Sequence, residues 1–101
     1  MNSYMINQEA DILKITISGE FTENVAATLQ KKLEGYIDHD IERVVFDFKE
    51  TTFLASSGLR ILFLAKKRIK KGMEVDIVNA GAAVLKILKM SGQTHEFNII
   101  D

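Results

Sequence analysis

The stretch from Val44 to Arg60 decides the fold: VVFDF at 44–48, KETT at 49–52 and FLASSGLR at 53–60. The first part is β-branched and aromatic apart from one aspartate, which is typical of a strand buried largely on both faces. The last part opens an apolar, proline-free segment of helical length that ends near Gly72. The polar residues 49–52 between them are expected to form a turn.

Ser56 or Ser57 therefore stands where a loop passes into a helix. A serine hydroxyl at this place can accept a hydrogen bond from one of the unpaired amides of the first turn, so either serine is a candidate N-cap. The same amides and the helix dipole also favour an added anion. Helix capping alone is the commoner role of such a serine, and a phosphate acceptor is the functional alternative.

The pattern around this stretch predicts an α/β domain. Ile12 to Ser18 alternates between apolar and polar residues, and Gly19 is expected to end that strand. Thr22 is a fair N-cap, and Asn79 is a second candidate for capping. Strands are expected at 4–8, 12–18, 41–48, 73–78 and 97–100, and helices at 23–38, 57–71 and 80–90.

This order places a helix between successive strands, so the sheet is expected to be mostly parallel, with right-handed crossovers. The expectation is one domain over residues 1–101, with a four- to five-stranded sheet and three helices packed mainly on one face.

The composition is that of an ordinary globular domain, with 47% hydrophobic and 27% charged residues. A net charge of −1 gives no reason to expect nucleic acid or an anionic membrane as a partner. There is no cysteine, no apolar run of transmembrane length and no signal peptide at the start, so a cytoplasmic protein is expected.

Residues Phe53 to Leu59 resemble the signature of the STAS domain of bacterial anti-sigma factor antagonists, where a strand and a short turn lead into Asp-Ser-Ser-Gly-Leu or a close variant. The resemblance covers nearly the whole chain. It includes Gly19-Glu20-Phe21 after an early strand, Asp47 in the third strand and Met90-Ser91-Gly92 at the end of a later helix. It implies a STAS-like fold.

The resemblance also implies a function. In these antagonists a partner kinase phosphorylates the first serine of the pair, which is Ser56 here. The implied partners are an anti-sigma factor that is a serine kinase and a PP2C-type phosphatase, and transcription would be regulated indirectly. The residues expected to contact or shape the partner face are Ser57, Gly58, Leu59, Arg60, Gly19, Glu20, Phe21, Phe53 and Leu54.

Two features differ from the family pattern. Ala55 stands where the family usually has aspartate, and the sequence ends at Asp101 without the usual terminal helix. Both favour a second interpretation, in which the domain is an unswitched STAS subunit docked to the ATPase of an ABC-type lipid transporter. A small-molecule or nucleotide binder is a third interpretation, for which the sequence offers no dedicated site.

The remaining candidates for chemistry are weak, and neither an enzyme nor a cofactor is expected. His39 and His95 are far apart and are expected in turns, which does not favour a metal site. There is no phosphate-binding glycine loop and no nucleophile elbow. Asp47 with Glu50 could form an acid pair, but a structural role at the strand end is favoured. The basic run Lys66 to Lys71 is interpreted as a solvated helix end.

Overall fold

The computed structural model describes residues 3–36, 40–66, 73–92 and 94–100. They form a single α/β domain with three helices and six strands. In chain order the elements are β1 (Ser3–Glu9), β2 (Ile12–Phe21), α1 (Glu23–Glu34), β3 (Arg43–Asp47), β4 (Thr51–Leu54), α2 (Ser56–Leu64), β5 (Glu74–Val78), α3 (Ala82–Met90), the 3₁₀ turn η2 (Thr94–Glu96) and β6 (Asn98–Ile100).

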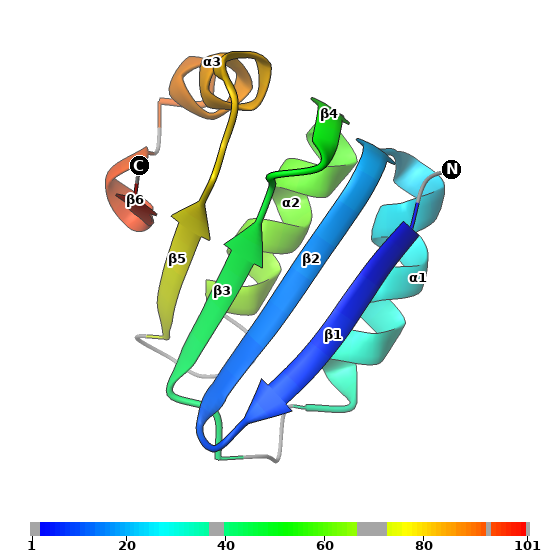
Figure 1. Ribbon diagram of the computed structural model, residues 1–101, viewed down its shortest axis with the longest axis vertical. Coiled ribbons are helices and arrows are strands. Elements are labelled where there is room, and N and C mark those ends of the chain that lie inside the picture. The colour runs from blue at the N-terminus through cyan, green and yellow to red at the C-terminus, as the bar shows by residue number, and fades with distance from the viewer. Residues whose placement is uncertain (1–2, 37–39, 67–72, 93, 101) are drawn as a thin grey trace.

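The sheet is mostly parallel, as the alternation of strands and helices predicts. Its strand order is β1-β2-β3-β5-β6, with β4 paired to β2 off this path (Figure 1). Only β1 runs antiparallel to its neighbour, because a tight turn joins it directly to β2. The other strand pairs are parallel. The strand count exceeds the expected four to five because β4 was not foreseen.

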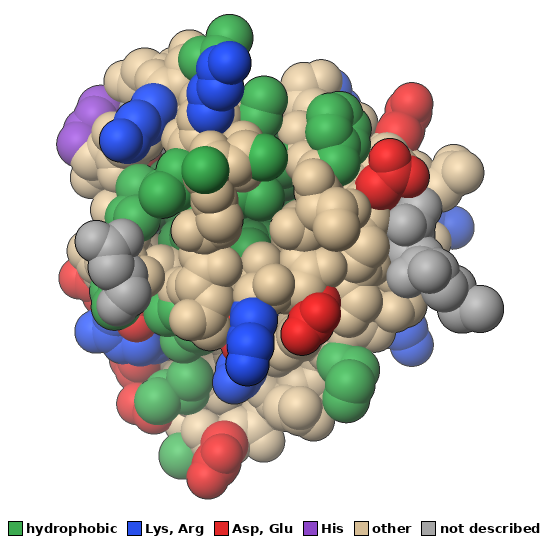
Figure 2. Space-filling view, turned by 45° about the horizontal axis from the view of Figure 1, so that its top comes forward, with side chains coloured by type: hydrophobic (Ala, Val, Ile, Leu, Met, Phe, Trp, Pro, Cys, Tyr) green, Lys and Arg blue, Asp and Glu red, His purple; other side chains and the backbone are tan. Residues whose placement is uncertain are grey.

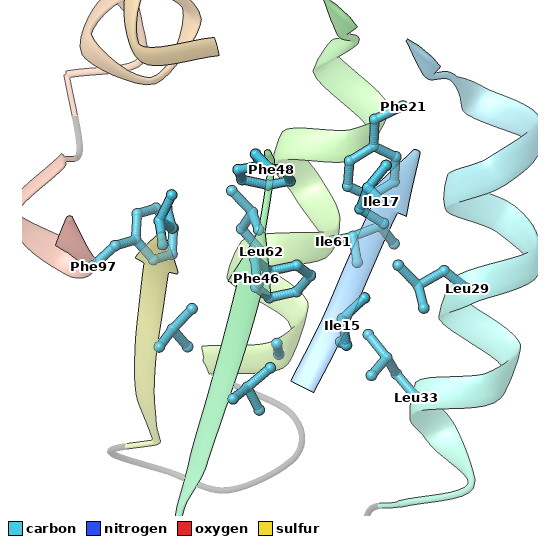
Figure 3. Packing of buried hydrophobic residues seen from close by; sticks show 14 of the residues in the cluster. Ile15, Ile17, Phe21, Leu29, Leu33, Phe46, Phe48, Ile61, Leu62 and Phe97 are labelled. Atoms are coloured by element: carbon cyan, nitrogen blue, oxygen red, sulfur yellow. The ribbon is translucent and has the colours of Figure 1, made fainter. Parts of the chain in front are cut away.

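Helices α1 and α2 cover the same face of the sheet, and the core lies between them and the strands (Figure 3). The side chains of Phe46, Ile15 and Leu62 have no exposed surface. Phe46 stacks on Phe48 with ring centroids 6.1 Å apart, and Phe48 in turn lies 6.4 Å from Phe21. Helix α3 lies apart from this layer, at the end where the parallel strands finish, in contact with β4.

Strand β2 bends at Gly19 instead of ending there, so the expected strand end was wrong. Gly19 has a φ of 81°, a conformation that glycine adopts without strain. The register shifts between Gly19 and Glu20, and β2 then continues to Phe21 alongside β4. Thr51 and Thr52, expected in a turn, are the first residues of β4. The end of β2 and the strand β4 therefore pair with each other beyond the main sheet.

Glycine and asparagine act at helix ends differently from the expectation. Thr22 is the N-cap of α1, as predicted, and its hydroxyl accepts from the Val25 amide at 3.4 Å. Gly35, expected inside that helix, is its C-cap. Asn79 is not a cap, since α3 begins at Ala82 with Gly81 as N-cap. Asn79 instead has a φ of 57° and belongs to the turn after β5.

Two expected helix ends, 37–38 and 67–71, lie outside the described residues. Within the described part of the chain, α1 finishes at Glu34 and α2 at Leu64, and Lys66 beyond α2 donates to the Met73 carbonyl at 3.2 Å. Of the basic run Lys66 to Lys71, only Lys66 therefore lies within the described residues.

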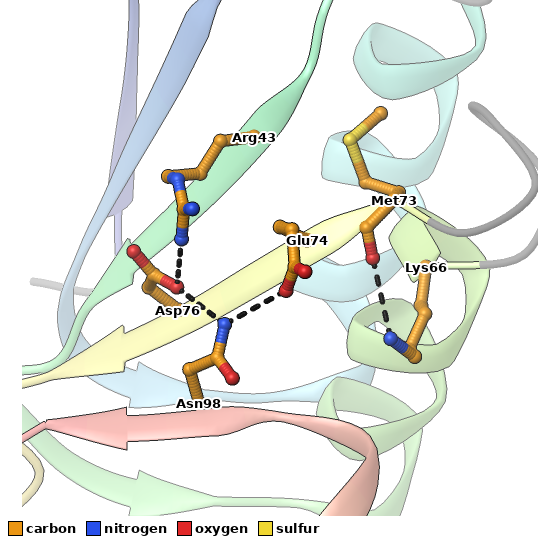
Figure 4. Close-up of polar contacts among 6 residues, drawn as sticks. All are labelled: Arg43, Lys66, Met73, Glu74, Asp76 and Asn98. Atoms are coloured by element: carbon orange, nitrogen blue, oxygen red, sulfur yellow. Dashed lines mark hydrogen bonds and ion pairs between the residues drawn. The ribbon is translucent and has the colours of Figure 1, made fainter.

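The face of the sheet opposite α1 and α2 carries a polar cluster across three strands (Figure 4). Arg43 donates to the Asp76 carboxylate at 2.6 Å. The Asn98 amide donates to Asp76 and to Glu74, at 2.9 Å in each case. Asp76 is only 7% exposed, so these donors compensate for the cost of burying its charge. The cluster fixes the short β6 onto β5.

Asp47, at the end of β3, contacts the neighbouring strand β2, the turn that follows β3 and the turn that follows β5. Its Oδ1 accepts from the Lys49 amide and from the Asn79 side chain, both at 3.0 Å, and Oδ2 lies 3.7 Å from Lys14 Nζ. Burial raises the pKa of this carboxyl. The bonds from Asn79 and Lys49 and the charge of Lys14 outweigh that effect, so the pKa lies below its ordinary value of 3.8.

A lowered carboxyl pKa stabilises the fold above the ordinary value and loses that contribution as the pH falls through the folded-state pKa. At neutral pH we expect Asp47→Asn to lower the free energy of unfolding by about 1 kcal/mol. The difference between the two proteins should shrink as the pH falls below 3.8 and should vanish once it is below the folded-state pKa of Asp47, because both side chains are then neutral. Urea titrations at a series of pH values measure this. A difference that stays constant into acid would show that the charge contributes nothing.

Candidate functional site

The candidate site lies where β2 and β4 finish side by side and α2 begins. The Ala55 amide donates to the Phe21 carbonyl at 3.0 Å, which ties the loop before α2 to the end of β2. The Thr51 hydroxyl donates to the Ile17 carbonyl at 2.8 Å and anchors the start of β4. These bonds fix the position of the first turn of α2 against the rest of the sheet.

Neither serine caps α2. Ala55 is the N-cap and supplies no side-chain hydrogen bond, while Ser56 is the first helical residue. The expectation of a serine cap was therefore wrong by one residue. The first amide that donates along the helix is that of Leu59, to the Ala55 carbonyl at 3.1 Å. The three amides before it have no helical acceptor, as at the start of any α-helix.

Ser56 is exposed at this turn, and Ser57 is half-buried. The hydroxyl of Ser56 thus stands at the positive end of the α2 dipole, where a negative charge is tolerated. Solvent and a docking protein can both reach it.

The residues expected to form the partner face separate into an outer and an inner group. Glu20 and Arg60 are exposed, and Phe53 is 47% exposed although it is a large aromatic residue. Phe21 and Leu54, in contrast, are 0% and 2% exposed. The second pair supports the site from beneath and cannot touch a partner directly. Of the other four, Gly19, Ser57 and Leu59 are half-buried and Gly58 is buried.

Gly58 is buried and packs directly on the inner group. A Cβ at this position would lie 2.8 Å from Leu54 Cδ1 and 2.9 Å from Phe21 Cγ. The close neighbours of this position are therefore side chains. A glycine here lets α2 approach the ends of β2 and β4.

We expect Gly58→Ala to lower the free energy of unfolding by about 1–3 kcal/mol, because the added methyl group overpacks a filled site. Gly81→Ala is the matched control, since a Cβ at the N-cap of α3 meets nothing within 4 Å. Chemical denaturation measures both variants. Equal stabilities would mean that Phe21 and Leu54 move aside without cost.

Ala55 leaves the amides of the first turn without a capping side chain, although its extended backbone (φ −77°, ψ 162°) suits an N-cap. We expect Ala55→Asp to raise the free energy of unfolding by about 1 kcal/mol by accepting from one of these amides. Ala55→Asn should give most of this gain without adding charge. A melting temperature that does not rise in either variant would contradict the expectation.

A shallow hollow lies between α1 and α2 beside the serines. It is lined by Glu23, Ala26, Ala27, Gln30, Ser57, Arg60 and Ile61. The sequence indicated Ser57 and Arg60 but none of the residues from α1. The available signal was the spacing of Glu23, Ala27 and Gln30, which places them on one face of a helix.

Figure 2 shows this end of the molecule turned toward the viewer. Lysine side chains lie over α3, and acidic side chains gather at the upper right, on the opposite side of this end. Lys86 and Lys89 are the exposed lysines of α3. At this end of the molecule the two signs of charge therefore lie on opposite sides, which favours one orientation of a charged partner.

The other candidate sites gain little support from the structure. Among the described residues no three histidine, cysteine or acidic side chains come together as a metal site. His95 lies 3.7 Å from Glu96, and His39 lies outside the described residues. Asp47 has the structural contacts given above, and none of them is to Glu50. No helix in the described part of the chain has the length and apolar character needed to cross a membrane.

Comparison with known proteins adds the family. A family model described as STAS domain matches residues 3–101. The fold is similar to that of an anti-sigma factor antagonist from Mycobacterium paratuberculosis, with a TM-score of 0.83, 20% identity and coverage of 98% of this chain and 85% of that one.

Two further solved structures share the fold. An anti-sigma-factor antagonist (STAS) domain protein from Planctomyces limnophilus has a TM-score of 0.83 at 15% identity, and the match covers 100% of this chain and 91% of that one. The Bacillus cell fate determinant SpoIIAA in its phosphorylated form has a TM-score of 0.77 at 14% identity, with coverage of 97% and 91%.

Proposed function

Because this chain belongs to the STAS domain family, we propose that it is an anti-sigma factor antagonist whose binding is switched off by phosphorylation of Ser56. In its unphosphorylated form it binds an anti-sigma factor that is also a serine kinase, and the sigma factor is released. Phosphorylation ends this complex, and a PP2C-type phosphatase restores it. The protein acts in the cytoplasm by binding and carries out no catalysis itself.

The observation that carries the proposal is the place of Ser56. Its side chain is exposed on the first turn of α2 and has the exposed Phe53 and Arg60 nearby in sequence. A kinase can therefore reach the hydroxyl without unfolding the helix. The buried Phe21, Leu54 and Gly58 hold the turn in place, so the surface that the partner meets is preorganised.

The switch follows from electrostatics at that turn. A phosphoryl group adds about −1.5 to −2 charges and three strong acceptors. The helix start tolerates this charge, so the domain keeps its fold. A partner surface that packs against the bare hydroxyl instead meets a charge that it has to desolvate. Each 1.4 kcal/mol lost in this way weakens the complex about tenfold.

Incubation with the cognate kinase and ATP tests the site. Mass spectrometry of the digested chain is expected to find one phosphate, on Ser56. Ser57→Ala should still be labelled and Ser56→Ala should not. Phosphate on Ser57 alone, or none on either serine, would reject Ser56 as the switch.

One observation favours a second function. Ala55 gives the first turn of α2 no acidic cap, which differs from the family pattern at the residue next to the acceptor. If a kinase requires that aspartate, the domain serves as a constitutive subunit docked to an ABC-type lipid transport ATPase. Affinity purification separates the two functions. A transporter ATPase recovered with the chain, without any kinase of the histidine-kinase-like ATPase type, would favour the second.

A further inference from the structure

The free edge of β1 is the feature that the proposed function leaves unused. Among the described strands β1 pairs only with β2, and it forms one border of the sheet (Figure 1). An edge strand presents backbone donors and acceptors that another strand can use. Folded proteins usually protect such an edge with lysine, proline, a bulge or a very short strand.

None of these devices protects β1. It is seven residues long, contains neither lysine nor proline, and pairs with β2 in unbroken register. The opposite edge of the sheet differs, because β6 has only three residues. The segment Ser3–Asn7 is also uncharged. The β1 edge is thus regular, and it is neutral over Ser3–Asn7, with Glu9 as its one charged residue.

The side chains of β1 are incompletely covered on both faces. Tyr4 and Ile6 point to the helix side, since they pair with the buried Ile17 and Ile15, yet both stay half-buried. Tyr4 borders a hollow between β1 and α1, lined by Ser3, Tyr4, Asn24, Val25 and Thr28. On the other face Met5 is 61% exposed.

We propose that a second copy of this chain occupies this edge, with the two β1 strands antiparallel about a twofold axis at Met5. In this register Met5 faces Met5, Ser3 faces Asn7, and Tyr4 faces Ile6 twice, so every pair is neutral. Pairs of an aromatic with a β-branched residue stabilise antiparallel strands. A twofold interface requires a strand that is complementary to itself, and Ser3–Asn7 meets that requirement.

The axis runs perpendicular to the sheet, so the helices of both copies lie on the same side of one continuous sheet. Ile6 of the second copy, opposite Tyr4, then lies at the hollow beside each β1. Asn24 and Thr28, which border it, are neutral and give no repulsion. Because β1 starts where β2 finishes, the Ser56 ends of the two copies point in opposite directions. Each copy can hold a partner of its own.

Sedimentation equilibrium tests the proposal. The unmodified chain is expected at twice its monomer mass of 11.4 kDa, and dilution should dissociate it. Met5→Lys and Met5→Glu each place two like charges opposite one another, so each should raise the dissociation constant by at least about tenfold. An equimolar mixture of the two variants should form a heterodimer, because the opposite charges then face each other.

Met90→Lys is the matched control, since Met90 is 73% exposed on α3, away from β1, and its change should leave the dimer intact. Hydrogen exchange gives a second reading, in which the amides of Ser3–Asn7 become protected as the concentration rises. Three results would each overturn the proposal: a monomer at every soluble concentration, a Met5→Lys variant that remains dimeric, or a mixture of the charged variants that stays monomeric.

Discussion

Ser56→Asp is expected to weaken binding to the anti-sigma factor by about a hundredfold or more while the melting temperature stays the same or rises slightly. The loss corresponds to about 3 kcal/mol or more, at 1.4 kcal/mol for each factor of ten. The carboxylate stands in for part of the phosphoryl charge at an exposed position on the first turn of α2. Asp at a helix start is favourable for the helix itself, by about 0.3–1 kcal/mol. Calorimetric titration and a thermal melt measure the two quantities.

Ser56→Ala is the control for loss of the hydroxyl, and it should bind nearly as well as the unmodified protein. Lys31→Gln changes the net charge by the same single unit at an exposed site in the last turn of α1, and separates a local effect from a change in overall charge. If Ser56→Asp binds as tightly as Ser56→Ala, a charge at this position does not prevent docking.

Phe46→Ala is expected to lower the free energy of unfolding by about 3–5 kcal/mol, which is the usual cost of truncating a buried aromatic residue. Phe46 has no exposed surface and lies between the sheet and α2, stacked on Phe48 (Figure 3). Total stabilities of such domains are about 5–15 kcal/mol. The variant should therefore melt far below the unmodified protein, at about 4–8 °C for each kcal/mol.

Phe53→Ala is the matched control, because this phenylalanine is 47% exposed on β4. Its stability should change by less than about 0.5 kcal/mol, as for an ordinary surface substitution. On the proposed partner face, however, it should weaken binding. A Phe46→Ala variant that unfolds at the same denaturant concentration as Phe53→Ala would show that the aromatic stack does not support the core.

Much of the fold could be predicted from hydrophobic periodicity. Alternation in Ile12–Ser18 identified β2, because a sheet covered on one face requires that pattern. The apolar run after Arg43 identified β3, but burial along β3 alternates and it is not buried on both faces as expected. The helices were identified in type and order for the same reason. Thr22 was correctly identified as the N-cap of α1, because its hydroxyl accepts from an amide only three residues further along the chain.

The departures arose where tertiary contacts override local preference. Thr51 and Thr52 join a strand because β2 bends at Gly19 and its last residues pair with β4. The paired residues are at least 30 positions apart in the sequence. Asn79 hydrogen-bonds to Asp47 across the sheet and adopts a positive φ, so it does not cap α3. Neither long-range contact has a signal in the local sequence.

Burial separates the residues that the sequence indicated for the candidate site into those that can contact a partner and those that support them. The sequence indicated Phe21, Leu54 and Gly58 as members of a partner face, but burial makes them its support. Sequence reasoning also placed a serine at the cap, where Ala55 stands. Exposure and helix phase decide these roles, and both depend on how α2 packs on β2 and β4.

The central claim is that a single charge on Ser56 decides whether the partner docks, without any change of fold. Titration of the unmodified and the stoichiometrically Ser56-phosphorylated chain into the anti-sigma factor tests it most directly, with thermal melts of both forms alongside. We expect dissociation constants that differ by about a hundredfold or more and melting temperatures that are nearly equal. Equal dissociation constants, or a phosphorylated form that has lost its fold, would contradict it.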